Sequence, residues 1–90
     1  MRKLEFTLNI PKEMTLINLC TGFIHHASEF DSDITIQVED SAVIDLKSIL
    51  GVMSLVYANG KAVTIEINGK DEDLAYMSLE RYAERIRLEQ

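Results

Sequence analysis

The side chains that could carry chemistry are few in this sequence, and their spacing matches no catalytic or metal-binding motif. Histidine occurs only at His25 and His26, and cysteine only at Cys20. Adjacent side chains diverge on a helix, so the histidine pair is a poor metal site. A lone thiol acts as a nucleophile only with a nearby base and a lowered pKa. Glycine-rich phosphate loops, zinc-like Cys/His spacings and carboxylate pairs on one face are absent from the sequence. We therefore expect no catalytic residue, no metal and no cofactor.

Charge and composition restrict the classes of partner. The 15 acidic residues outnumber the 9 basic ones, which gives a formal net charge of -6. Nucleic-acid binding depends on a basic face, so we expect neither nucleic-acid nor membrane partners. No apolar run approaches the about 20 residues that cross a bilayer, and the N-terminal MRKLEF lacks the apolar core of a secretory signal. The length and the single cysteine indicate one domain, residues 1–90, in the reducing cytoplasm.

Hydrophobic periodicity predicts the elements that must position any site. Apolar residues alternate, as in half-buried strands, over residues 4–10, 34–38, 42–44 and 63–67. They follow helical spacing over residues 16–27, 48–57 and 74–86. The order β-α-β-β-α-β-α predicts an α+β fold, with a four-stranded antiparallel sheet and three helices on one face.

One hydrophobic core is expected beneath these helices. Its predicted members are Leu19, Cys20, Phe23, Ala27, Leu74 and Ile86. The buried side of the last helix is predicted to be Leu74, Met77, Leu79, Tyr82 and Ile86. In this arrangement Cys20 is a core thiol rather than a nucleophile, and the two histidines are solvated or lie at the rim of the core.

The run from Lys47 to Leu55, KSILGVMSL, resembles the regulatory-serine helix of HPr, the small phosphocarrier family of the bacterial sugar phosphotransferase system. Ala27-Ser28 followed by Phe30, and Asp71-Glu72-Asp73 at the start of the last helix, are also similar to that family. The resemblance extends over nearly the whole chain. It implies an open-faced β-sandwich with this element order.

The sequence departs from the family at the start of the first helix. The family has a histidine there, in a segment reading His-Ala-Arg-Pro-Ala, whereas this chain reads TLINLC from Thr15 to Cys20. Counting back from Ala27 places Leu16 at the histidine position and Asn18 at the arginine position. A loop one residue longer would place Thr15 there instead. Imidazole carries phosphate through a labile P–N bond, which leucine cannot form and a stable phosphothreonine ester does not replace. The resemblance therefore implies a protein that is not competent as a histidine phosphocarrier.

Ser48 has two compatible interpretations. Serine at a helix start is an ordinary N-cap. The resemblance also implies a regulatory phosphorylation site for a serine kinase, and a phosphate at a helix N-terminus meets free N–H groups. We expect the Ser48 hydroxyl to be exposed at the N-terminus of the short second helix.

The apolar residues that follow Ser48 are either core or a partner-docking surface. Val52 and Leu55 can supply the buried side of so short a helix. The resemblance implies that this helix presents its other apolar residues to partners, and an exposed patch of that kind usually marks a binding surface. The predicted docking residues are Ile17, Asn18, Ile49, Leu50 and Met53.

The resemblance and the missing histidine together predict a non-catalytic protein that acts by binding other proteins in carbohydrate regulation. The expected partners are phosphotransferase-system proteins or a catabolite regulator, and an HPr kinase if Ser48 is modified. The alternative is a small structural or dimerisation module on the same scaffold, with no role in sugar uptake.

Overall fold

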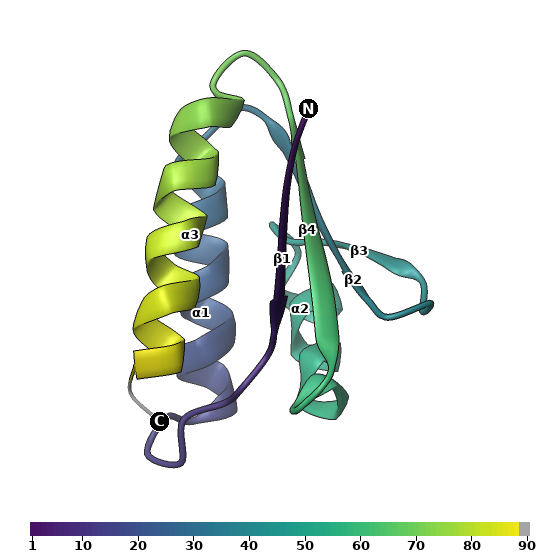
Figure 1. Ribbon diagram of the computed structural model, residues 1–90, viewed down its shortest axis with the longest axis vertical. Coiled ribbons are helices and arrows are strands. Elements are labelled where there is room, and N and C mark those ends of the chain that lie inside the picture. The colour runs from purple at the N-terminus through teal and green to yellow at the C-terminus, as the bar shows by residue number, and fades with distance from the viewer. Residues whose placement is uncertain (89–90) are drawn as a thin grey trace.

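The structure is a computed structural model that describes residues 1–88, with side chains described to Ile86. Four strands and three helices follow one another as predicted, with a short 3-10 helix, η1, directly after the second helix (Figure 1). Their bounds are β1 Arg2–Thr7, α1 Leu16–Ser28, β2 Asp33–Val38, β3 Val43–Asp45, α2 Ile49–Met53, η1 Ser54–Ala58, β4 Ala62–Asn68 and α3 Glu72–Leu88. The predicted α+β fold is confirmed. The first strand is shorter than predicted, because it ends at Thr7 rather than near Ile10.

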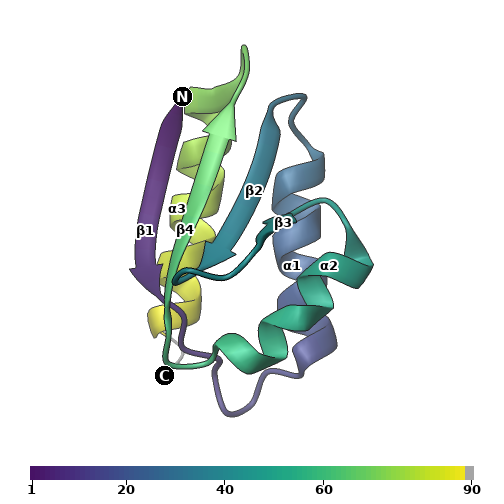
Figure 2. The same ribbon diagram turned by 90° about the vertical axis from the view of Figure 1, so that its right-hand side faces the viewer.

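The strands form one antiparallel sheet in the order β1-β4-β2-β3. The central strand β4 pairs Ile65 with Leu4 of β1 on one side and with Ile36 of β2 on the other. Helices α1 and α3 lie side by side against one face of the sheet, and α2 lies beside the first half of α1 (Figures 1 and 2). Among the described residues, no helix has both the length and the apolar character that crossing a membrane requires.

Helix α1 is fixed to α3 by Tyr82, whose side chain is buried between the two helices. The Tyr82 hydroxyl donates a hydrogen bond to the Leu19 carbonyl at 3.0 Å. Its ring meets the Phe23 ring edge to face, with 5.0 Å between the centroids. A side chain at position 22 would prevent this approach, since a Cβ built on Gly22 would lie 2.0 Å from the Tyr82 hydroxyl.

The predicted core is confirmed except on α3. Leu19, Cys20, Phe23, Ala27 and Ile86 are buried. Leu74 and Met77, which we predicted to be buried, are 63% and 49% exposed. The buried side of α3 is Ala75, Leu79, Tyr82 and Ile86. Helical spacing of i, i+4, i+7 and i+11 places these four residues on one stripe that excludes Leu74 and Met77. The prediction was wrong because the buried stripe begins at Ala75, one position after Leu74.

The loop after α1 is tied to the start of α3 by the Asp71 carboxylate. This carboxylate accepts hydrogen bonds from the backbone N–H groups of Asp31 and Ser32, at 2.8 and 3.0 Å, and from the Ser32 hydroxyl. These bonds favour the charged form, so the Ser32 hydroxyl, followed by the Asp31 N–H, lowers the pKa of Asp71 below its ordinary value of 3.8. The carboxylate therefore connects the C-terminal end of α1 to the N-terminal end of α3.

Candidate functional site

The N-terminus of α1 is capped by Thr15. Its backbone is extended (φ -75, ψ 156), and its Oγ1 accepts a hydrogen bond from the Asn18 N–H at 3.1 Å. Thr15, Ile17 and Asn18 are exposed, whereas Leu16 is half-buried against the core. Free N–H groups make a helix N-terminus a place for anions. The first turn nevertheless presents a hydroxyl, two aliphatic chains and an amide, and none of these groups forms a labile bond to phosphorus.

Both histidines lie in the last turn of α1, far from that N-terminus. His25 is exposed, and its Nε2 lies 3.1 Å from the Glu29 carboxylate. His26 is half-buried, stacks on Tyr82 at 4.8 Å, and has Nδ1 2.8 Å from the Ser78 hydroxyl. Burial, followed by the neighbouring His25, lowers the pKa of His26 and so favours its neutral form. The interpretation of the histidines as solvated or rim residues agrees with this geometry.

Ser48 is the N-cap of α2, as its sequence position indicates. Its backbone is extended (φ -99, ψ 118), and its Oγ accepts a hydrogen bond from the Gly51 N–H at 3.4 Å. The residue is half-buried rather than exposed, which corrects the sequence prediction. The reason is the cap itself, because the hydroxyl is turned toward the first turn of the helix. Beside it, the Lys47 ammonium donates to the Phe30 carbonyl at 2.7 Å.

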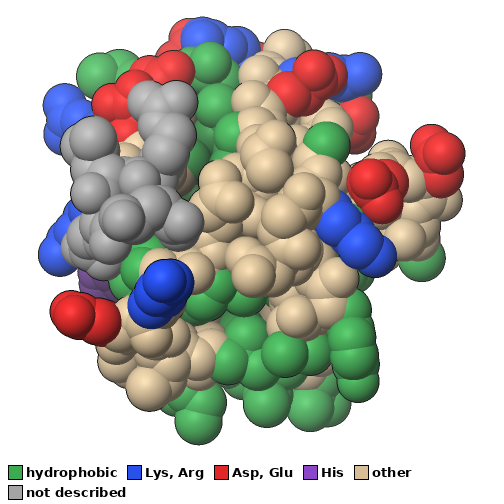
Figure 3. Space-filling model, turned by 60° about the horizontal axis from the view of Figure 1, so that its bottom comes forward, with side chains coloured by type: hydrophobic (Ala, Val, Ile, Leu, Met, Phe, Trp, Pro, Cys, Tyr) green, Lys and Arg blue, Asp and Glu red, His purple; other side chains and the backbone are tan. Residues whose placement is uncertain are grey.

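The predicted docking residues lie on the surface. We define the α1–α2 surface as Ile17, Asn18, Ile49, Leu50 and Met53. All five are exposed, and the exposed fractions of the apolar members run from 41% for Met53 to 82% for Leu50. Figure 3 turns the end of the molecule that carries the N-terminus of α1 forward and shows hydrophobic side chains gathered there. An exposed apolar patch of this kind is typical of a binding surface.

Residues beneath the α1–α2 surface hold the two helices together. Val52 and Leu55 are buried, as predicted. The buried Cys20 thiol lies 3.4 Å from the Val52 carbonyl and donates to it, and burial raises the pKa of this thiol. The reading of Cys20 as a core thiol is therefore confirmed. Gly51 permits α2 to lie close to β3, since a Cβ there would be 2.8 Å from Cγ2 of Ile44.

The sequence prediction missed the continuation of this apolar face onto η1. Val56 and Tyr57 are 44% and 80% exposed. The signal was present, since Leu50, Met53 and Tyr57 follow the helical spacing i, i+3, i+7. Within residues 1–86, no group of three or more His, Cys, Asp or Glu side chains is placed to hold a metal ion. Within the described residues, the site is an exposed apolar surface without such a cluster.

Comparisons with known proteins agree with this fold. The family model described as "PTS HPr component phosphorylation site" matches residues 12–85. The HPr-like protein Crh of Bacillus subtilis is 36% identical over 62 residues, which cover 69% of this chain and 72% of that protein. The phosphocarrier protein HPr of Lysinibacillus sphaericus is 43% identical over 53 residues, which cover 59% of each chain.

Solved structures give the same result over almost the whole chain. HPr-C-His from Thermoanaerobacter tengcongensis superposes with a TM-score of 0.77 at 27% identity, covering 93% of this chain and 92% of the other. The crystal structure of Bacillus subtilis Crh, described as a dimer with a swapped domain, superposes with a TM-score of 0.67 at 29% identity, covering 94% and 93% of the two chains.

Exchange of Met53 tests whether the α1–α2 surface is separate from the core. The Met53→Asp variant should unfold in urea within about 0.5 kcal/mol of the parent, because surface substitutions rarely cost more. As the matched control, Leu55→Ala should lose about 2–5 kcal/mol, since it empties a buried site two residues along the chain. A Met53→Asp loss as large as that of the control would mean that Met53 is part of the core.

Proposed function

The chain belongs to the HPr family of the bacterial sugar phosphotransferase system, and on this premise we propose that it is a regulatory HPr-like protein that binds partners without carrying phosphate on a histidine. The observation that carries the proposal is the N-terminus of α1, where Thr15 caps the helix and Leu16 begins it. Both histidines lie at the opposite end of that helix. Members of this family act as phosphocarriers or regulators rather than as enzymes, and the residues here favour the regulatory role.

The chemistry of phosphoryl relay explains why this helix start is decisive. A carrier must accept and release phosphate readily, which imidazole does because its P–N bond is labile and its ring titrates near neutrality. Whether Leu16 or Thr15 occupies the histidine position, its side chain cannot form the labile P–N bond. Asn18 at the arginine position also offers no cation to pair with a phosphate. At the other end of the helix, the dipole disfavours an anion beside His25 or His26.

The α1–α2 surface supports a docking role in the absence of phosphoryl transfer. Its apolar side chains are exposed above a buried layer that includes Val52 and Leu55. Such a surface gains affinity by burying apolar area, and this gain does not require an imidazole. The proposed partners are proteins of the phosphotransferase system or a catabolite regulator.

Ser48 is the proposed switch on this surface, as a substrate of an HPr kinase. A phosphate there adds about -1.5 to -2 charges next to Ile49 and Leu50, at the positive end of a helix. The hydroxyl must first leave its hydrogen bond to the Gly51 N–H, and loss of a cap costs about 1 kcal/mol. The phosphate oxygens can then accept from the same N–H groups. Phosphorylation would therefore change the charge of the surface while the fold is kept.

A dimerisation module remains the second candidate function. It is supported by two similar structures that are described as dimers, HPr of Thermoanaerobacter tengcongensis and the swapped Crh of Bacillus subtilis. The two candidates differ in what occupies the surface. A regulator binds a different protein there, whereas a dimerisation module binds its own copy.

The absence of phosphocarrier activity is tested with labelled phosphoenolpyruvate and the first enzyme of the system. The chain should remain unlabelled under conditions that fully label the phosphocarrier protein HPr of Lysinibacillus sphaericus, because no imidazole stands at the N-terminus of α1. Acid-stable and acid-labile label are distinguished by brief acid treatment before mass spectrometry. An acid-labile phosphate on His25 or His26 would refute the proposal.

Kinase treatment tests the switch separately. Incubation with an HPr kinase and ATP should place one phosphate on Ser48, and the Ser48→Ala variant should take up none. Ser54→Ala is the matched control, since Ser54 is the exposed C-cap of α2 and its hydroxyl donates to the Gly51 carbonyl at 2.6 Å. Label that persists in Ser48→Ala, or disappears in Ser54→Ala, would reduce Ser48 to a helix cap.

A further inference from the structure

The edge of the sheet at β1 is separate from the α1–α2 surface and has features of a second binding site. Strand β1 pairs with β4 on one side, from Arg2 to Thr7. It is the first strand in the sheet order, so among the described residues no strand pairs with its other side. Backbone N–H and C=O groups on such an edge are available to an added strand.

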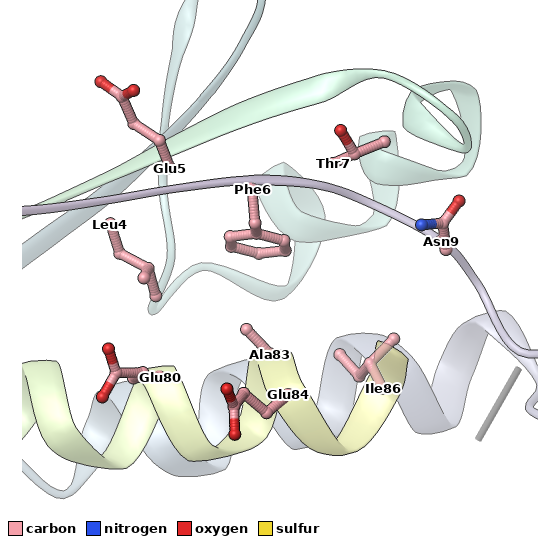
Figure 4. Close-up of a pocket in the computed structure, with 9 residues that line it drawn as sticks. All are labelled: Leu4, Glu5, Phe6, Thr7, Asn9, Glu80, Ala83, Glu84 and Ile86. Atoms are coloured by element: carbon pink, nitrogen blue, oxygen red, sulfur yellow. The ribbon is translucent and has the colours of Figure 1, made fainter. Parts of the chain in front are cut away.

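A groove runs along this edge between β1 and α3 and has an apolar floor. Its volume is about 420 Å³. Figure 4 shows Leu4 and Phe6 of β1 pointing toward α3, and Ala83 and Ile86 of α3 pointing back toward the strand. Phe6 and Ala83 are half-buried, so part of their apolar surface remains open to the groove. The groove can therefore accept an aliphatic side chain from a segment lying along β1.

The unpaired charge at this edge is negative. Glu5 of β1 and Glu80 of α3 line the groove and are exposed, and neither forms an ion pair within the described part of the chain. The basic residues of the same strand are already engaged. Arg2 contacts Asp73 at 2.7 Å and Lys3 contacts Glu66 at 3.5 Å. Figure 4 shows the Glu5 side chain on the face of β1 that points away from α3 and Glu80 on the α3 side, so each face of this edge carries one unpaired carboxylate.

We propose that the β1–α3 groove binds an extended, basic segment of a partner protein, which pairs with the edge of β1 as an added strand. Side chains alternate along such a strand, so aliphatic residues would face Leu4, Phe6 and Ala83 while Lys or Arg residues on the opposite face lie beside Glu5. A second copy of this chain fits less well, because each copy carries a net charge of -6. This site goes beyond the proposed docking function, which uses other residues.

The proposal is tested with a short synthetic peptide of alternating lysine and valine, added to the whole protein at low ionic strength. Amide resonances of β1 and of the Glu80–Ile86 part of α3 should shift, and those of the α1–α2 surface should not. A peptide of alternating glutamate and valine is the control for hydrophobicity, and it should bind at least tenfold more weakly. Equal binding of the two peptides, or shifts centred on α1 and α2, would overturn the proposal.

Variants assign the charge contribution to particular carboxylates. Glu5→Gln should weaken binding of the lysine peptide about two- to fivefold, the effect of one exposed ion pair. Asp40→Asn removes an exposed acid from the turn before β3, at the opposite edge of the sheet, and should leave binding unchanged. Equal effects of the two substitutions would show attraction to net charge alone and contradict the site. Sedimentation that shows self-association through the β1 edge, with no peptide binding, would contradict it as well.

Discussion

The contact of Tyr82 with α1 fixes the helix on which the α1–α2 surface is built. Its hydroxyl donates a hydrogen bond to the Leu19 carbonyl, and its ring packs against the Phe23 ring. Both contacts require that position 22 has no side chain, as is the case for Gly22. A buried hydroxyl without its acceptor would cost about 1–3 kcal/mol, so this geometry is strongly preferred. With α1 fixed to α3, its other flank meets α2 through Cys20 and Val52. The N-terminus of α1 and the exposed face of α2 are thereby held on the same end of the molecule.

Phosphoryl chemistry and partner recognition depend on different parts of this arrangement. The α1–α2 surface is maintained by a buried layer, including Val52 and Leu55, that also belongs to the core. The phosphoacceptor of a carrier depends on one side chain at the start of α1, where Thr15 is exposed and outside that core. A change at Thr15 would therefore alter the chemistry with little effect on packing, whereas Leu16 is half-buried against the core. Our proposal requires only that transfer can be lost in this way while the α1–α2 surface is kept.

Sequence periodicity predicted the strands, the helices and the apolar surface, because alternation and helical spacing report burial directly. It was wrong where burial depends on the approach of two elements. Leu74 and Met77 are larger and more apolar than Ala75, yet the small residue is buried because the helix turns the stripe of Ala75, Leu79, Tyr82 and Ile86 toward the core. The half-buried state of Ser48 was missed for a related reason, since a capping hydroxyl turns inward toward the Gly51 N–H. The β1–α3 groove joins residues from the two ends of the chain, and no local pattern indicates it.

The central claim is that the fold is that of a phosphocarrier which lacks only the groups that hold phosphate. Introducing a histidine and an arginine at the start of α1 tests this claim most directly. Two double variants cover both candidate positions, Thr15→His with Asn18→Arg and Leu16→His with Asn18→Arg. Each is incubated with labelled phosphoenolpyruvate and the first enzyme of the phosphotransferase system. We expect at least one variant to acquire an acid-labile phosphate on the introduced histidine. If both variants fold as the parent does and neither is labelled, the docking surface is not that of the family and the account is wrong.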